Sequence, residues 1–123
     1  MKRILICEDD AAVATILVRT LTREGFEVTA IGHAADALAK MVETGPPDLL
    51  ISDLMLPPPM SGAELASQML ARHPALPVIA ITGYLPDDMT HQTLKELDVL
   101  VLQKPVARQK LIDTVRALLD RAT

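Results

Sequence analysis

Polar side chains follow several short apolar runs in this sequence, at the points where the runs end. These positions are Glu8-Asp9-Asp10, Asp53, Thr82-Gly83 and Lys104-Pro105. Carboxylates held a few ångströms apart raise one another's pKa, and they are unfavourable together unless a cation neutralises them. A hard divalent ion with oxygen ligands, Mg²⁺ above all, suits such a cluster and keeps waters for a phosphate ligand. The residue types therefore predict a magnesium and phosphate site, provided that the fold brings these ends together.

The same residues could also perform phosphoryl chemistry. A carboxylate that helps to hold Mg²⁺ can attack phosphorus and form an aspartyl phosphate. The metal ion and a nearby ammonium group then offset the charge on the phosphoryl oxygens. Lys104 is the candidate for the ammonium group, and Thr82 could donate a hydroxyl hydrogen bond to the same oxygens. Gly83 leaves room for the group to enter, so the pattern favours phosphoryl capture.

Each of these residues also has an ordinary structural interpretation. Acidic residues before an Ala-rich helix often serve as N-caps, and we assign that role to Asp10. Asp53 could form an Asx turn before the proline-rich loop, and Lys104 could be a solvated lysine before a rigid proline. Only their joint placement at strand ends favours a site over these simpler interpretations.

The elements that must position these residues alternate between strands and helices. Apolar runs predict strands at 4–7, 27–31, 49–51, 78–81 and 99–102. Helical spacing predicts helices at 11–24, 34–43, 62–73, 87–97 and 107–121, the last with Leu111, Ile112, Val115, Leu118 and Leu119 on one face. Because parallel strands need helical crossovers, this order indicates an α/β domain with an open, doubly wound parallel sheet. Such sheets bind ligands beyond the carboxyl ends of their strands, where the polar residues lie.

Length and composition limit what else the chain can do. The 123 residues are 50% hydrophobic, carry a net charge of −4 and suit one compact domain, residues 1–123. Without a basic stripe, and with Phe26 and Tyr84 as the only aromatic residues, direct nucleic-acid binding is not expected. The single cysteine, Cys7, excludes an internal disulfide and is expected to be a small buried hydrophobe. No apolar run is long enough for a signal peptide core or a membrane span, so we expect a cytoplasmic chain with no membrane partner.

In combination, these residues resemble the receiver domain of bacterial two-component response regulators, over nearly the whole chain. The matching motifs are Ile-Leu-Ile-Cys-Glu-Asp-Asp at 4–10, Asp-Leu-Met-Leu-Pro at 53–57 with Met60-Ser61-Gly62, Ala-Ile-Thr-Gly at 80–83, and Lys104-Pro105. The resemblance implies a flavodoxin-like fold, with five helices around a five-stranded sheet in the order 2-1-3-4-5. It also implies a sensor histidine kinase or histidine phosphotransfer protein as the phosphoryl donor.

The resemblance further implies a role for individual residues. Asp53 would be the phosphoacceptor, and Asp9 and Asp53 would bind Mg²⁺ directly, with Mn²⁺ as a possible substitute. Glu8 would complete the acidic pair, and the backbone carbonyl of Met55 would complete the protein ligands. Lys104 would pair with the phosphate, Thr82 would be the switch hydroxyl, and the bond before Pro105 would be cis.

Two departures from the family pattern bear on mechanism. Pro58 and Pro59 both stand between Pro57 and Met60, where the family usually has one residue. Val101 stands at the switch position that usually holds Tyr or Phe, so an aromatic side chain cannot move inward there. Tyr84 is the only aromatic residue close enough along the chain to substitute. We expect the bulk of Met55 and Tyr84 to shield an acyl phosphate from water.

The resulting hypothesis is a phosphoacceptor receiver domain, a signalling module more than an enzyme, that catalyses its own Mg²⁺-dependent phosphorylation and hydrolysis. Because the receiver uses the 123 residues, we expect output through contact with a downstream protein, whether the chain acts alone or belongs to a longer protein. One alternative is a degenerate receiver that acts as an unphosphorylated interaction module. Another is an aspartate-nucleophile phosphatase, although Met55 stands where such enzymes commonly place a second acid.

Overall fold

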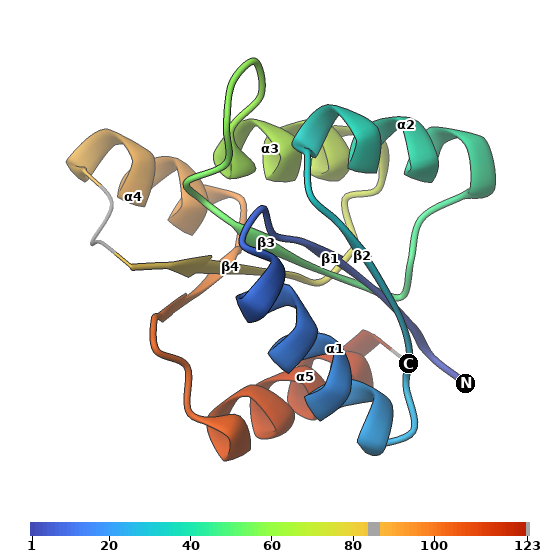
Figure 1. The fold of residues 1–123 in the computed structure, drawn as a ribbon. Helices are drawn as coiled ribbons and strands as arrows, with labels where there is room; N and C mark the ends of the chain where they lie inside the picture. The colour runs from blue at the N-terminus through green and yellow to red at the C-terminus, as the bar shows by residue number, and fades with distance from the viewer. Residues whose placement is uncertain (84–86, 123) are drawn as a thin grey trace.

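Strands and helices alternate along the whole chain, as the sequence predicts. The computed structural model describes residues 1–83 and 87–122 (Figure 1). The elements are β1 (Arg3–Cys7), α1 (Ala11–Arg23), β2 (Glu27–Ile31), α2 (Ala34–Thr44), β3 (Leu49–Asp53), α3 (Gly62–Arg72), β4 (Val78–Thr82), α4 (Asp88–Glu96), β5 (Leu100–Gln103) and α5 (Arg108–Ala122). No helix in the described ranges is long and apolar enough to cross a membrane.

The strands form one parallel sheet of five strands in the order β2-β1-β3-β4-β5. Helices α2, α3 and α4 cover one face, and α1 and α5 cover the other (Figure 1). The order of strands reverses between β1 and β3, which is where such sheets bind their ligands. The fold class, the number of strands and the strand order are therefore confirmed.

Two hydrophobic cores hold the helices to the sheet, because successive strand residues point to opposite faces. Leu50 and Ala80 pack toward Leu65 and Leu94, which belong to α3 and α4. On the opposite face, the strand residues pack against α1 and α5. The five apolar residues predicted for one face of the last helix are all buried: Leu111, Ile112, Val115, Leu118 and Leu119.

Side-chain caps begin α1 and α3 next to the carboxyl edge of the sheet. Asp10 accepts hydrogen bonds from the backbone N–H groups of Ala12 (2.9 Å) and Val13 (3.2 Å), which confirms it as the N-cap of α1. Ser61 accepts a hydrogen bond from the Glu64 N–H at the start of α3 (3.1 Å). These caps satisfy N–H groups that have no partner within the helix, and they fix where each chain segment leaves the sheet.

Strands β3 and β4 run further than the apolar pattern predicts. The predicted strands end at residues 51 and 81, whereas β3 continues to Asp53 and β4 to Thr82. Asp53 still pairs with Ile81, and Thr82 with Gln103, so parallel pairing extends the strands through polar residues. As a result, both residues belong to the paired end of the sheet.

Candidate functional site

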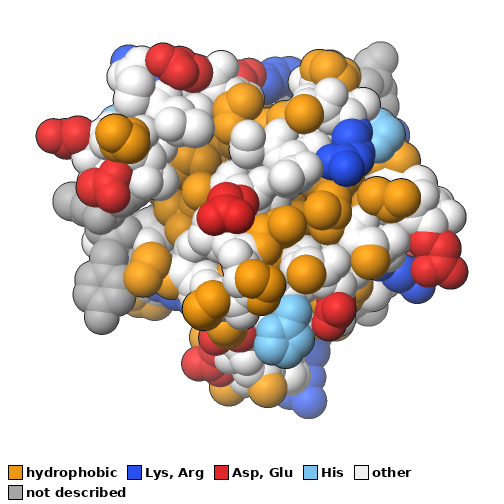
Figure 2. Space-filling view, turned by 90° about the horizontal axis from the view of Figure 1, so that it is seen from above, with side chains coloured by type: hydrophobic (Ala, Val, Ile, Leu, Met, Phe, Trp, Pro, Cys, Tyr) orange, Lys and Arg blue, Asp and Glu red, His pale blue; other side chains and the backbone are white. Residues whose placement is uncertain are grey.

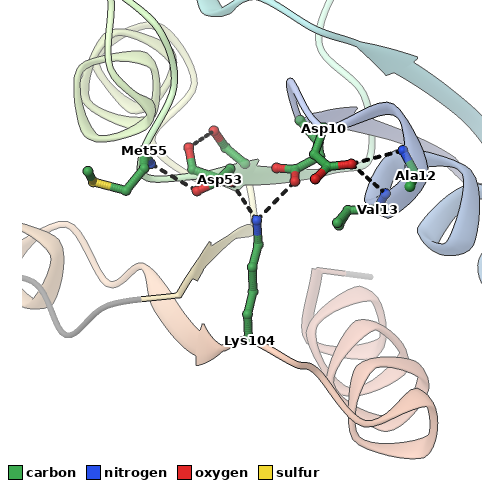
Figure 3. Close-up of polar contacts among 8 residues, drawn as sticks. Asp10, Ala12, Val13, Asp53, Met55 and Lys104 are labelled. Atoms are coloured by element: carbon green, nitrogen blue, oxygen red, sulfur yellow. Dashed lines mark hydrogen bonds and ion pairs between the residues drawn. The ribbon is translucent and has the colours of Figure 1, made fainter.

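The carboxyl ends of β1, β3 and β5 bring three charged side chains into direct contact (Figure 3). The Nζ atom of Lys104, which follows β5, donates to Oδ2 of Asp53 at 2.6 Å. The same Nζ atom donates to Oε1 of Glu8, which follows β1, at 2.9 Å. One ammonium group therefore joins two carboxylates from different strands.

The two carboxylates that contact Lys104 are buried. Glu8 is only 4% exposed and Asp53 only 6%, whereas Asp9 is exposed at the rim. Removal of a carboxylate from water is costly unless a charge or hydrogen bond replaces the lost solvation. Lys104 supplies that charge, and its own side chain remains partly exposed. The sequence alone does not indicate which of Glu8 and Asp9 is buried. In the structure Glu8 is buried and Asp9 is exposed.

Burial and charge shift the two buried carboxyl groups in opposite directions. Burial raises the pKa of Glu8 to about 7, and the neighbouring Asp53 adds to this shift, while Lys104 only partly opposes it. Burial also acts to raise the pKa of Asp53, but hydrogen bonds with Glu8, Lys104 and the Met55 N–H, together with the charge of Lys104, lower it. Glu8 therefore binds a proton more tightly than Asp53 does, and Asp53 is ionised at neutral pH.

The acidic residues of this site fit a hard divalent cation. One carboxylate oxygen from each of Glu8, Asp9 and Asp53 lies within 4.8 Å of the other two. When all three carboxyl groups are ionised and Lys104 is counted as well, the group carries a formal charge of −2. Because all three side-chain donors are oxygens, the group suits Mg²⁺ better than a soft metal ion. These three residues could therefore hold the metal ion.

Met55 contacts the phosphoacceptor candidate through its backbone. Its N–H donates to Oδ1 of Asp53 at 2.9 Å, the contact of an Asx turn, so the simpler interpretation of Asp53 also describes a real feature. Both carboxylate oxygens of Asp53 are thereby held, Oδ1 by the Met55 N–H and Oδ2 by Lys104. The Met55 side chain itself is 64% exposed and belongs to the outer surface of the loop.

The remaining predicted site residues lie along β4 and β5 or just beyond them. Thr82 is buried, and its carbonyl accepts a hydrogen bond from the Lys104 N–H at 2.7 Å. Gly83 is exposed, with open space where a Cβ would stand.

Val101 lies in β5 and packs, half-buried, against the core under α3 and α4. Tyr84 lies outside the described residues. The Lys104–Pro105 peptide bond is cis.

Gly62 stands where the backbone leaves no room for a side chain, a constraint that the sequence motif does not reveal. A Cβ built on this residue would lie 1.8 Å from the carbonyl oxygen of Asp53 and 2.8 Å from Cα of Leu54. The Gly62 N–H also donates to the Leu54 carbonyl at 3.2 Å. The first turn of α3 therefore packs directly on the backbone of the phosphoacceptor candidate, and only glycine fits this contact.

A doubly wound sheet with an acidic cluster and a lysine at its switch point defines a class of phosphate-binding or metal-binding α/β domains. Residues 4–116 match the response regulator receiver domain family. This chain therefore belongs to the response regulator receiver domain family, whose members are modules of signalling proteins that work with a kinase and downstream effectors.

Individual relatives agree with this assignment. The chain is 33% identical to the response regulator receiver protein CpdR of Brucella abortus, over 99% of this chain and 100% of that protein. It is 37% identical to the sensory transduction protein RegX3 of Mycolicibacterium smegmatis, and spans about half (52%) of that protein. The crystal structure of a CheY-like receiver domain protein from Methanospirillum hungatei superposes with a TM-score of 0.90 at 30% identity, over 99% of this chain and 96% of that one.

Proposed function

We propose that residues 1–123 form a phosphoacceptor receiver domain of the cytoplasm, in which Asp53 takes a phosphoryl group from a phosphohistidine donor. The observation that supports this proposal best is the buried Asp53, whose pKa is lowered by hydrogen bonds with Glu8 and with Lys104, the latter at 2.6 Å. An ionised carboxylate oxygen can attack phosphorus, and the bond from phosphorus to the donor nitrogen then breaks. The donor would be a sensor histidine kinase or a histidine phosphotransfer protein.

The other site residues would stabilise the transferred group. Lys104, which contacts Asp53, would pair with a phosphoryl oxygen, and the buried Thr82 would donate its hydroxyl to another. Asp9, Asp53 and the Met55 carbonyl would bind Mg²⁺, or Mn²⁺ in its place, with Glu8 in the surrounding acidic group. The bound ion would offset negative charge on the phosphoryl oxygens. The open space at Gly83 would admit the phosphoryl group.

The signal would pass to a downstream protein through the surface around β5. Phosphorylation would draw Thr82 toward the phosphoryl group and alter α4, β5 and α5, which a downstream protein could recognise. Val101 packs, half-buried, in this region, and Leu100 is exposed beside it. A ligand changes a conformational equilibrium only if it binds one conformer better than the other. Amide hydrogen exchange over residues 84–105, with and without beryllofluoride and Mg²⁺, tests this switch, and identical exchange would contradict it.

A degenerate receiver is the second candidate, because Val101 cannot provide an aromatic switch and the loop after Asp53 is longer than usual. Incubation with acetyl phosphate and Mg²⁺, followed by intact mass measurement, separates the candidates. One stable phosphoryl adduct that Asp53→Asn abolishes would support the receiver. No adduct would support the unphosphorylated interaction module, and turnover of a generic phosphomonoester would support a phosphatase.

A further inference from the structure

A small cavity lies between α2 and strands β1 and β2, at the end of the sheet opposite the carboxyl edge. Helix α2 covers this side of the sheet (Figure 1) and belongs to a face on which hydrophobic and charged side chains are mixed (Figure 2). The cavity volume is about 220 Å³, below the range of roughly 300–1,000 Å³ that drug-sized ligands need. The side chains that line it include Arg3, Leu5, Glu27, Thr29, Lys40 and Met41.

Three charged side chains line this cavity without pairing with one another. Arg3 and Glu27 stand at partner positions of β1 and β2, yet in the described part of the chain neither they nor Lys40 form an ion pair. The Arg3 guanidinium instead donates to the Pro46 carbonyl at 2.8 Å, and the Arg3 backbone N–H donates to Oδ2 of Asp48 at 2.7 Å. These contacts hold Arg3 in place and leave other guanidinium N–H groups for an acceptor.

The inner wall of the cavity is apolar and aliphatic. Leu5 of β1 and Met41 of α2 are both buried, in the core between the sheet and α2. Thr29, the partner of Leu5 in the sheet, is exposed and adds a hydroxyl group. None of the described residues around the cavity is aromatic, so a planar ring would find no stacking partner there. The wall therefore suits a short aliphatic group better than an aromatic ring or a nucleobase.

The charges around the cavity select the polar part of a ligand. Arg3 and Lys40 would attract a simple anion, but Glu27 would repel it, and a simple cation would meet the reverse. A molecule with both charges matches all three side chains, with its carboxylate at Arg3 and Lys40 and its ammonium group at Glu27. We propose that this cavity binds a free α-amino acid with an aliphatic side chain. The site lies at the opposite end of the strands from Asp53 and does not depend on the function proposed for that residue.

Titration of the isotope-labelled chain with L-leucine tests the proposal, because NMR spectra of the backbone amides report both the affinity and the location of binding. Two analogues of leucine each lack one charge: isocaproate lacks the ammonium group, and isoamylamine lacks the carboxylate. The variant Glu27→Gln removes the carboxylate that would pair with the ammonium group. The matched control, Glu43→Gln, removes an exposed carboxylate of α2 that does not line the cavity.

The proposal predicts saturable binding of L-leucine, with amide shifts at residues 3–5, 27–29 and 40–45. Each analogue should bind at least about tenfold more weakly, because it leaves a charged side chain of the cavity without a partner. Glu27→Gln should weaken leucine binding by about the same factor, and Glu43→Gln should leave it unchanged. The absence of leucine binding, shifts confined to other residues, or equal affinities for leucine and isocaproate would overturn the proposal. Equal effects of the two substitutions would overturn it as well.

Discussion

Nζ of Lys104 lies 2.6 Å from Oδ2 of Asp53 and 2.9 Å from Oε1 of Glu8, and so joins β5 to β3 and β1 across the carboxyl edge of the sheet. These contacts hold two buried carboxylates that would otherwise repel each other. They also raise the pKa of Lys104 against the opposing effect of its own burial. The lysine therefore stabilises the site before any phosphoryl group arrives.

Replacement of this lysine should destabilise the chain most when no divalent cation is present. Lys104→Met leaves Glu8 and Asp53 without their common partner, and we expect a loss of about 1–3 kcal/mol in the free energy of unfolding, because the lysine is partly exposed. Urea unfolding with and without Mg²⁺ measures the effect, and Mg²⁺ should reduce the loss.

The control for Lys104→Met is Arg116→Met. Arg116 pairs with Glu24 at 2.8 Å, but both partners are more exposed than Glu8 and Asp53 are. We expect this exposed pair to contribute less than about 1 kcal/mol. Equal losses in the two variants, or a loss at Lys104 that Mg²⁺ does not reduce, would contradict the role given to the lysine.

An added methyl group at Gly62 should disturb the backbone of Asp53. In Gly62→Ala the new Cβ would meet the Asp53 carbonyl oxygen at 1.8 Å, so α3 or the end of β3 must move. We expect a loss of about 1–3 kcal/mol, the usual cost of an overpacked position. In the control, Gly32→Ala, the nearest contact of the Cβ would be 3.8 Å, and the change should stay within about 0.5 kcal/mol. Similar denaturation midpoints for the two variants would disprove the close contact.

The raised pKa of Glu8 predicts how stability depends on pH in the absence of metal. The folded chain holds this proton up to about pH 7, whereas an ordinary glutamate loses it near pH 4.5. Between these values unfolding releases a proton, so the contribution of Glu8 to stability is full below pH 4.5 and is lost as the pH rises to about 7. The loss is at most about 3 kcal/mol.

Glu8→Gln isolates this contribution, because its amide group does not titrate. The difference in unfolding free energy, variant minus unaltered chain, should rise between pH 4.5 and about 7 and then level off. Urea unfolding at several pH values in EDTA measures it, with Glu43→Gln as the control for the loss of an exposed carboxylate. A difference that falls over this range would show that the sign of the shift is wrong.

Cys7 should be chemically inert while the chain is folded. Its thiol is fully buried, and burial together with the nearby carboxylates, Glu8 above all, raises its pKa to about 12. The thiolate is the reactive form, so alkylation by iodoacetamide at neutral pH should be far slower than in the same chain unfolded by urea. Rapid alkylation of the folded chain would show that the residue is accessible and ionised.

The sequence was sufficient for the fold because its local patterns agree with its tertiary structure. Apolar runs identified all five strands, and helical spacing placed every helix end within one or two residues. Asp10 was recognisable as a cap because its side chain serves N–H groups only two and three residues away. Such features depend on near neighbours in the chain, which periodicity and residue type describe well.

Contacts between distant residues could not be predicted in the same way. Strand ends indicate that Glu8, Asp53 and Lys104 lie near one another. They do not indicate that one ammonium group contacts both carboxylates, which stand 96 and 51 positions before it in the sequence. Nor did they distinguish the buried Glu8 from the exposed Asp9. The role of Gly62 depends on what a Cβ at this position would meet in space, and sequence spacing carries no information about that contact.

The central claim is that Asp53 receives the phosphoryl group, and the most direct test locates that group on the chain. After incubation with acetyl phosphate and Mg²⁺, borohydride reduces an aspartyl phosphate to homoserine, and tandem mass spectrometry identifies the residue that has changed. Our proposal predicts homoserine at position 53 alone, and none in Asp53→Asn or when EDTA replaces Mg²⁺. Homoserine at another aspartate, or no conversion in the unaltered chain, would contradict it.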